Sequence, residues 1–108
     1  MAPRRIFRRR RANDDISAAI TFYTKNAGVS VARDFIDELE AAVMRIAKTP
    51  TIGSLRYAHS MDLPGLRCSS LKRFPYLVFY MEKEGRIEVA RVLHERMEIG
   101  EQLSDEQV

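Results

Sequence analysis

Basic side chains gather in the second half of the chain, and they are of the types that bind or cleave nucleic acids. Such cations can neutralise phosphates or stabilise the charge that builds up on phosphorus during RNA cleavage. Cleavage also needs a general base near the attacking 2′-hydroxyl and a general acid near the leaving oxygen. Only His94 and Tyr80 are obvious candidates for these two roles, so cleavage and simple binding both stay open. The basic set consists of Arg67, Lys72, Arg73, Arg91, His94 and Arg96.

Other site chemistries have little support in the sequence. The chain has one cysteine, Cys68, and two histidines, His59 and His94. A cysteine and a histidine can form a nucleophilic pair, but a lone cysteine in a strand is more often a small buried apolar residue. Two histidines and one cysteine, without acidic residues at matching spacing, do not make a zinc site. No glycine-rich phosphate loop is present, so we expect neither a metal nor a cofactor.

Three consecutive strands carry the basic set, over residues 66–74, 76–82 and 86–94. The run from Tyr76 to Met81 is almost entirely apolar and aromatic. A strand covered on both faces loses its alternation, so this run predicts the central strand. Gly85 in the turn at 83–85 can take a positive φ, which is typical of a hairpin. Pro64-Gly65 predicts a tight turn before the first of the three strands.

The residues upstream predict a short strand and two amphipathic helices that cover this sheet. Arg5 to Arg9 can form the strand, and Asn13 or Asp14 offers a cap for the first helix. Gly28 predicts the stop between the helices, and Ser30 a cap for the second. The order predicts an α+β fold: an N-terminal strand, an α-helical hairpin on one face, and a three-stranded antiparallel meander. The apolar stripes are Ile16, Ala19, Ile20 and Tyr23, then Val31, Ala32, Phe35, Ile36, Leu39, Ala42, Val43 and Ile46.

Length and charge predict a single cytoplasmic domain over residues 1–108, with an arginine-rich first strand or arm at 1–11 and a C-terminal tail at 97–108. Ile99 and Leu103 can pin a final helical turn in this tail. No apolar run is long enough for a membrane span, and one cysteine fits a reducing compartment. The net charge is +3, yet Arg4–Arg11 alone holds six arginines, and the rest of the chain is negative. The run indicates either a charged edge strand or a contact for nucleic acid or an acidic protein.

Several motifs in this order resemble the RelE/ParE superfamily of toxins from bacterial type II toxin–antitoxin systems. They are Thr49-Pro50 with Gly53 after the helical hairpin, the segments 63–67 (LPGLR) and 73–80 (RFPYLVFY), and the segment 87–94 (IEVARVLH). The similarity runs from about Asn13 to Arg96, and the FPYLVFY and RVLH pieces are most similar to the ParE branch. The fold of this family is a helical hairpin packed on an antiparallel sheet that includes the N-terminal strand, which agrees with the order derived above.

The resemblance implies a small toxin that a cognate antitoxin, ParD-like or another, neutralises. ParE-like toxins inhibit DNA gyrase by binding, whereas RelE-like relatives are ribosome-dependent endoribonucleases that cleave messenger RNA. In those relatives the functional groups lie where this chain has Arg67, Arg73, Arg91 and His94. The chain lacks the dense lysine and arginine set of a RelE nuclease, which favours a gyrase inhibitor over an enzyme. A non-toxic antitoxin-binding module is the third alternative.

The antitoxin is expected to bind as an extended segment with an amphipathic helix along the helical hairpin, and to add a strand at a sheet edge. Its expected anchors are Ile20, Tyr23, Phe35 and Leu39, which belong to the apolar stripes. The resemblance also leaves a role for Arg4–Arg11 in contact with a nucleic-acid complex.

Overall fold

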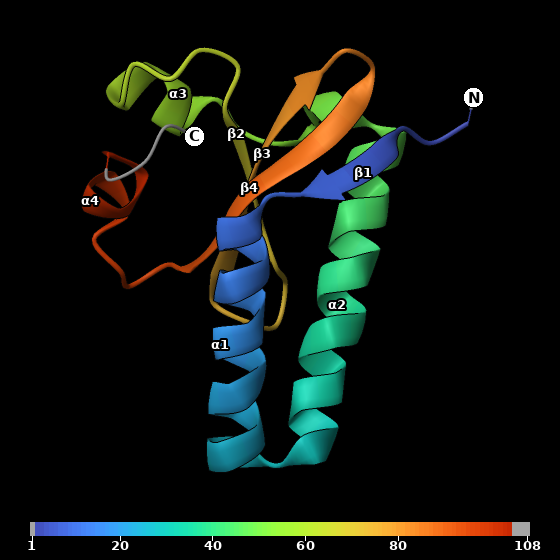
Figure 1. The fold of residues 1–108 in the computed structure, drawn as a ribbon, viewed down its shortest axis with the longest axis vertical. Coiled ribbons are helices and arrows are strands. Elements are labelled where there is room, and N and C mark those ends of the chain that lie inside the picture. The colour runs from blue at the N-terminus through green and yellow to red at the C-terminus, as the bar shows by residue number, and fades with distance from the viewer. Residues whose placement is uncertain (1, 105–108) are drawn as a thin grey trace.

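The computed structural model describes residues 2–104, which form two long helices, a four-stranded sheet and three shorter helical segments (Figure 1). The predicted order of a strand, a helical hairpin and three strands is confirmed. None of the helices within these residues has the length and apolarity needed to cross a membrane. The elements are β1 (Arg5–Arg8), α1 (Arg10–Ala27), α2 (Val29–Lys48), the 3₁₀ turn η1 (Pro50–Ile52), α3 (Arg56–Ser60), β2 (Arg67–Ser70), β3 (Tyr76–Lys83), β4 (Arg86–His94) and α4 (Ile99–Ser104).

The four strands form a mixed sheet in the order β1-β4-β3-β2. Strands β2, β3 and β4 make the predicted antiparallel meander. The N-terminal strand joins the sheet as expected, but it runs parallel to β4 rather than antiparallel. It pairs only with residues 86–89, and the chain then leaves the sheet with Arg9 N–H donating to the Val89 carbonyl at 2.9 Å. The remaining outer edge of β4 is therefore left for α1 to cover.

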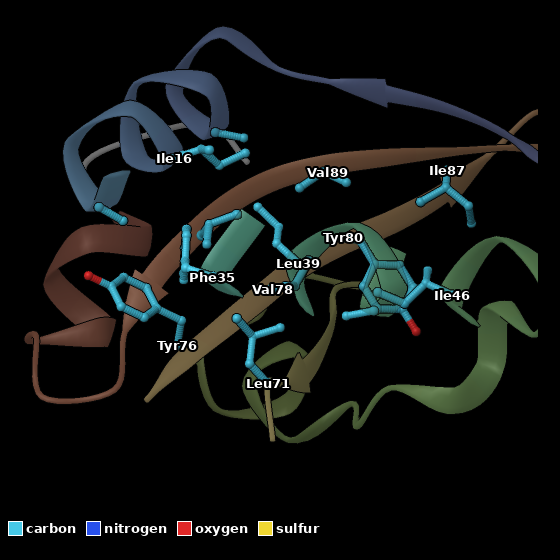
Figure 2. Packing of buried hydrophobic residues seen from close by; sticks show 14 residues of the cluster. Ile16, Phe35, Leu39, Ile46, Leu71, Tyr76, Val78, Tyr80, Ile87 and Val89 are labelled. Carbon is cyan, nitrogen blue, oxygen red and sulfur yellow. The ribbon is translucent and has the colours of Figure 1, made fainter. Parts of the chain in front are cut away.

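Helices α1 and α2 cover one face of the sheet with their apolar stripes. Phe35, Leu39 and Ile46 of α2 are fully buried against Tyr76 and Tyr80 of β3, and Figure 2 shows these side chains meeting. The rings of Phe35 and Tyr76 lie 5.2 Å apart in an edge-to-face arrangement, which adds to the gain from burial. The helical hairpin is thus held to the sheet by a continuous apolar core.

The opposite face of the sheet is also covered, by the short helices α3 and α4. Leu77, Phe79 and Leu93 point to this side and pack with Ile99 and Leu103 of α4. The predicted position of the helical hairpin on one face is confirmed, and the short helices add a second layer that the sequence did not predict. The same apolar run that predicted a central strand requires this second cover: residues 76–81 are all buried. The helical turn predicted at Ile99 and Leu103 is confirmed, while residues 105–108 of the predicted tail lie outside the described part.

The three turns predicted from glycine are confirmed. Gly28 separates the two long helices with φ 97°, and Gly65 has φ 84° in a turn closed by Leu66 N–H donating to the Leu63 carbonyl at 3.1 Å. Glu84 and Gly85 have φ 52° and 76° and connect β3 to β4. Positive φ at both central residues defines a type I′ turn, whose twist suits a hairpin. This turn fixes the register of the β3–β4 pair.

Some predicted element ends were wrong. Helix α1 begins at Arg10, so Asn13 lies in its first turn and donates its backbone N–H to the Arg9 carbonyl instead of capping the helix. Helix α2 begins directly after Gly28, which leaves no capping role for Ser30. Strand β2 ends at Ser70, because the chain turns back there and Leu71 N–H donates to the Tyr76 carbonyl at 3.0 Å.

Candidate functional site

Arg91, one of the predicted target-binding residues, lies inside the fold. Its side chain is only 4% exposed and forms an ion pair with Asp15 of α1, with Nε and Nη2 at 2.8 and 2.9 Å from the two carboxylate oxygens. It also donates to the backbone carbonyl and the side chain of Gln102 in α4, both at 3.2 Å. Asp15 accepts a third hydrogen bond from Val92 N–H at 3.0 Å. This cluster joins α1, β4 and α4 and closes the edge of β4 that β1 leaves uncovered.

Arg67 holds the loop after the helical hairpin. Its Nη1 donates to the carbonyls of Gly53 and Thr51, at 2.8 and 3.3 Å. Tyr80, its neighbour in register on β3, donates its hydroxyl to the Pro50 carbonyl at 2.7 Å and accepts from Gly53 N–H at 2.9 Å. Burial raises the pKa of Tyr80, although the Gly53 hydrogen bond and the nearby Arg67 charge lower it. Tyr80 is fully buried, and its hydroxyl holds the loop at Pro50 and Gly53 in place.

Arg73 lies at the surface and is held by α2. Its side chain is 67% exposed, and its Nε and backbone N–H bind the two carboxylate oxygens of Glu38 at 3.0 and 2.8 Å. Burial alone would raise the pKa of Glu38, but the hydrogen bonds from Arg73 outweigh it and lower the pKa. Much of the guanidinium therefore remains available for a partner.

His94 ends β4 and is half-buried. Its Nδ1 accepts the backbone N–H of Arg96 at 3.0 Å, and its ring lies edge-to-face on Tyr76 with centroids 5.1 Å apart. A hollow of about 490 Å³ opens here between α1 and the end of β4. It is lined in part by Phe22 and Met97, two large apolar side chains that remain about half exposed.

The two candidates for general acid and base do not meet. His94 pairs with Tyr76, whereas Tyr80 lies four residues further along β3. Four residues of strand span about 13 Å, and the Tyr80 hydroxyl is already bonded on both sides. Arg67 neighbours Tyr80, Arg91 lies opposite Phe79, and neither pairs with the His94 end. The described residues thus show no constellation in which these groups converge on one scissile bond.

Cys68 is buried and unpaired by disulfide, and burial raises the pKa of its thiol, which disfavours the reactive thiolate. His59 lies exposed on α3, and the charged group that acts on the pKa of Cys68 is Arg56, which lowers it against the effect of burial. The same residues contain no group of three or more His, Cys, Asp or Glu side chains that could hold a metal ion. The burial of Cys68 therefore disfavours a nucleophilic role for its thiol.

The four residues expected to anchor an antitoxin divide into two kinds. Phe35 is fully buried in the core, and Leu39 is only 3% exposed, where it lines a hollow of about 210 Å³ beside Ile6 and Met44. Ile20 and Tyr23 of α1 are partly buried at its border. Tyr23 contacts Phe35 and the ring of Phe74, with centroids 5.5 and 5.2 Å apart. Surface for a partner on α1 is therefore restricted to Ile20, Tyr23 and their exposed neighbours.

Sequence reasoning missed the acidic partners and the exposed apolar residues of this region. Neither Asp15 nor Glu38 was predicted from the sequence to be the partner of a cation. Phe22 falls outside the apolar stripe of α1 at Ile16, Ala19, Ile20 and Tyr23. That displacement was the one available signal, because a large aromatic residue off the buried stripe remains at the surface.

The fold and the site define a small α+β protein whose predicted functional cations mostly hold its own elements together. A family described as "ParE toxin of type II toxin-antitoxin system, parDE" matches residues 6–99. Toxin ParE3 of Caulobacter vibrioides is 31% identical over 100 residues, which cover 92% of this chain and 94% of that protein. Toxin ParE1 of Mycobacterium tuberculosis is 38% identical over 77 residues, 70% of this chain and 74% of that protein.

A solved structure described as a chromosomal ParDE toxin–antitoxin system from P. aeruginosa has the same fold. Its TM-score is 0.71 at 21% sequence identity, over 84% of this chain and 95% of that one. The chain belongs to the ParE toxin family, and the predicted resemblance to this branch is confirmed. It is therefore the toxin of a type II toxin–antitoxin pair, with an antitoxin as its partner.

Proposed function

We propose that this toxin inhibits DNA gyrase in the cytoplasm by binding to it, without cleaving a substrate, and that a cognate antitoxin releases the inhibition. The proposal rests on one observation: the side chains that were candidates for catalysis bind other parts of the same chain. Arg91 is buried against Asp15, and Tyr80 holds the loop at Gly53. Because His94 lies about 13 Å along the sheet from Tyr80, an acid and a base for RNA cleavage are not paired.

Arg73 and His94 are the two predicted target-binding residues that remain accessible. Arg73 keeps a largely exposed guanidinium, fixed in direction by Glu38. A guanidinium that is already oriented loses less freedom when it binds a carboxylate of a partner. We assign these two residues to direct contact with gyrase. Arg67 and Arg91 contribute by holding the loop and the β4 edge.

The antitoxin covers the exposed side of α1 in this proposal. Ile20 and Tyr23 border the core there, and Phe22 stands next to the hollow that ends at Met97. An amphipathic helix or extended segment can place apolar side chains in such a hollow. Phe22 and Met97 would then become buried in the complex.

A supercoiling assay tests the proposal. Purified toxin is added to gyrase, ATP and relaxed plasmid, and supercoiling is expected to stop and to resume when the antitoxin is added. Arg73→Ala should weaken inhibition about ten-fold, the loss of one charged contact of roughly 1.4 kcal/mol. Its control is Lys72→Ala, since Lys72 is exposed and adjacent. Full supercoiling in excess toxin, with rapid messenger RNA cleavage in cells that express it, would instead assign ribonuclease activity.

A further inference from the structure

Three cations stand side by side across three strands at one end of the sheet. Arg5 of β1 is in register with Arg86 of β4, and Arg86 is in register with Lys83 of β3. Residues opposite each other on neighbouring strands point to the same face, and neighbouring strands lie about 4.8 Å apart. Like charges in this arrangement destabilise a sheet. The row Arg5–Arg86–Lys83 therefore concentrates positive charge on a patch about 10 Å wide.

Acidic side chains neutralise this row only at its centre. Arg86 binds Glu88 at 2.8 Å and Glu84 at 3.4 Å. Glu88 is shared with Arg9, at 2.9 Å, and hydrogen bonds from Arg9 and Arg86 lower the pKa of Glu88. By contrast, Arg5 and Lys83 form no ion pair with any residue in the range 2–104. Both ends of the row keep their charge for an external anion.

An exposed aromatic ring lies beside the row. Ile6 packs into the core on the helical side, so strand alternation turns Arg5 and Phe7 to the opposite face. Phe7 is 44% exposed. The guanidinium carbons of Arg5 and Arg86 lie 5.6 and 5.1 Å from the centre of its ring. The ring orients the guanidinium of Arg5, whose N–H groups stay available for a phosphate, whereas those of Arg86 donate to Glu84 and Glu88.

We propose that this surface, formed by Arg5, Phe7, Lys83 and Arg86, binds single-stranded nucleic acid. Arg5 and Lys83 contact the phosphates, Arg86 helps to orient the ring, and the exposed part of Phe7 contacts a base. A cationic groove or patch with an aromatic platform is the combination that single strands require, because every base has an apolar face and every linkage a charge. An acidic peptide would use the cations but gain little from the ring, so the aromatic residue favours nucleic acid.

The surface is separate from the region assigned to the antitoxin. Figure 1 shows β1 beside the turn that joins β3 and β4, at the end of the molecule away from the connection between α1 and α2. Strand β1 is also an edge strand, since β4 is its only neighbour among the strands formed by residues 2–104. A nucleic-acid strand can therefore reach this surface from the side.

Fluorescence anisotropy with a labelled strand of about 20 deoxythymidines tests the proposal on the isolated protein. The variant Arg5→Ala/Lys83→Ala removes the two unneutralised charges. The slope of log affinity against log salt concentration should become shallower by about 1.4. At about 0.1 M salt this change corresponds to about 25-fold weaker binding. The matched control is Lys25→Ala/Arg45→Ala, which removes one lysine and one arginine that are exposed on the helical hairpin. Phe7→Leu keeps an apolar side chain and should weaken binding about five-fold.

Three outcomes would overturn the proposal. The control could lose as much affinity as the test variant, which would mean attraction by net charge alone. Polyglutamate could compete as well as the oligonucleotide while Phe7→Leu changes nothing, which would assign an acidic protein. The test variant could self-associate while its affinity for the oligonucleotide is unchanged, which would mean that the row prevents association through the sheet edge. Gyrase is absent from this assay, so failure here leaves the proposed inhibition untouched.

Discussion

The ion pair between Asp15 and Arg91 gives the strongest test of how the fold is held together. Asp15→Ala removes a carboxylate that binds this guanidinium through both of its oxygens, together with the acceptor of Val92 N–H. Taking one partner from a buried pair costs about 3–5 kcal/mol. We expect the lower end, about 3 kcal/mol, because Arg91 keeps its two acceptors on Gln102. For a chain of this length the melting temperature should fall by about 12 °C.

Urea and thermal unfolding followed by circular dichroism measure this loss. Asp14→Ala is the matched control, because Asp14 is the adjacent residue, is exposed and carries the same charge; it should change stability by less than about 0.5 kcal/mol. In the double variant Asp15→Ala/Arg91→Met no charge of this pair stays buried. The double variant should therefore lose less unfolding free energy than the sum of the losses of its two single variants. A loss for Asp15→Ala within about 1 kcal/mol of the control would refute the reasoning.

Three further results are expected. Tyr80→Phe should destabilise the fold by about 1–3 kcal/mol in urea unfolding, because Gly53 N–H loses its acceptor, and an unchanged midpoint would contradict the assigned role of the hydroxyl. Glu88→Gln should lower the free energy of unfolding by about 1–2 kcal/mol at neutral pH. Since the pKa of Glu88 is lowered in the fold, this difference in stability from the wild type should vanish as pH falls through the lowered pKa. A difference that does not change with pH would exclude the charge of Glu88 as its source. Phe22→Asp should weaken antitoxin binding by at least about ten-fold in calorimetry, whereas the exposed Thr21→Asp should have a smaller effect and equal effects would reject the surface on α1.

The parts of the fold that follow local rules could be predicted from the sequence. Hydrophobic runs and periods depend only on neighbouring residues, so the strand at Arg86–His94 and both long helices were placed closely. The turns at Gly28, Gly65 and Gly85 follow from the freedom of glycine at positive φ. Helix α3 was not predicted, because a short helix owes its stability to tertiary burial rather than to propensity, whereas the two apolar residues Ile99 and Leu103 did indicate α4.

The candidate site could not be predicted in the same way, because its contacts join distant residues. Asp15 and Arg91 are 76 positions apart, and Glu38 is 35 positions from Arg73. Such pairs form only when the helical hairpin has settled on the sheet at one angle and one register. Residue type and strand alternation identify the cations, but they do not show which of them are already neutralised.

In the arginine run, too, the sequence shows the cations but not which of them are neutralised by acidic side chains. Counting charge along the chain places the excess in Arg4–Arg11, yet Arg4 and Arg9 are balanced by Glu82 and Glu88 from the β3–β4 hairpin. The unneutralised charge of the row belongs to Arg5 and to Lys83, which lies 78 positions further along the chain. The register of the sheet brings these two together and places Phe7 beside them. Substituting the run as a block would therefore mix residues that stabilise the edge with one that can contact a ligand, and only the paired change at Arg5 and Lys83 separates the two effects.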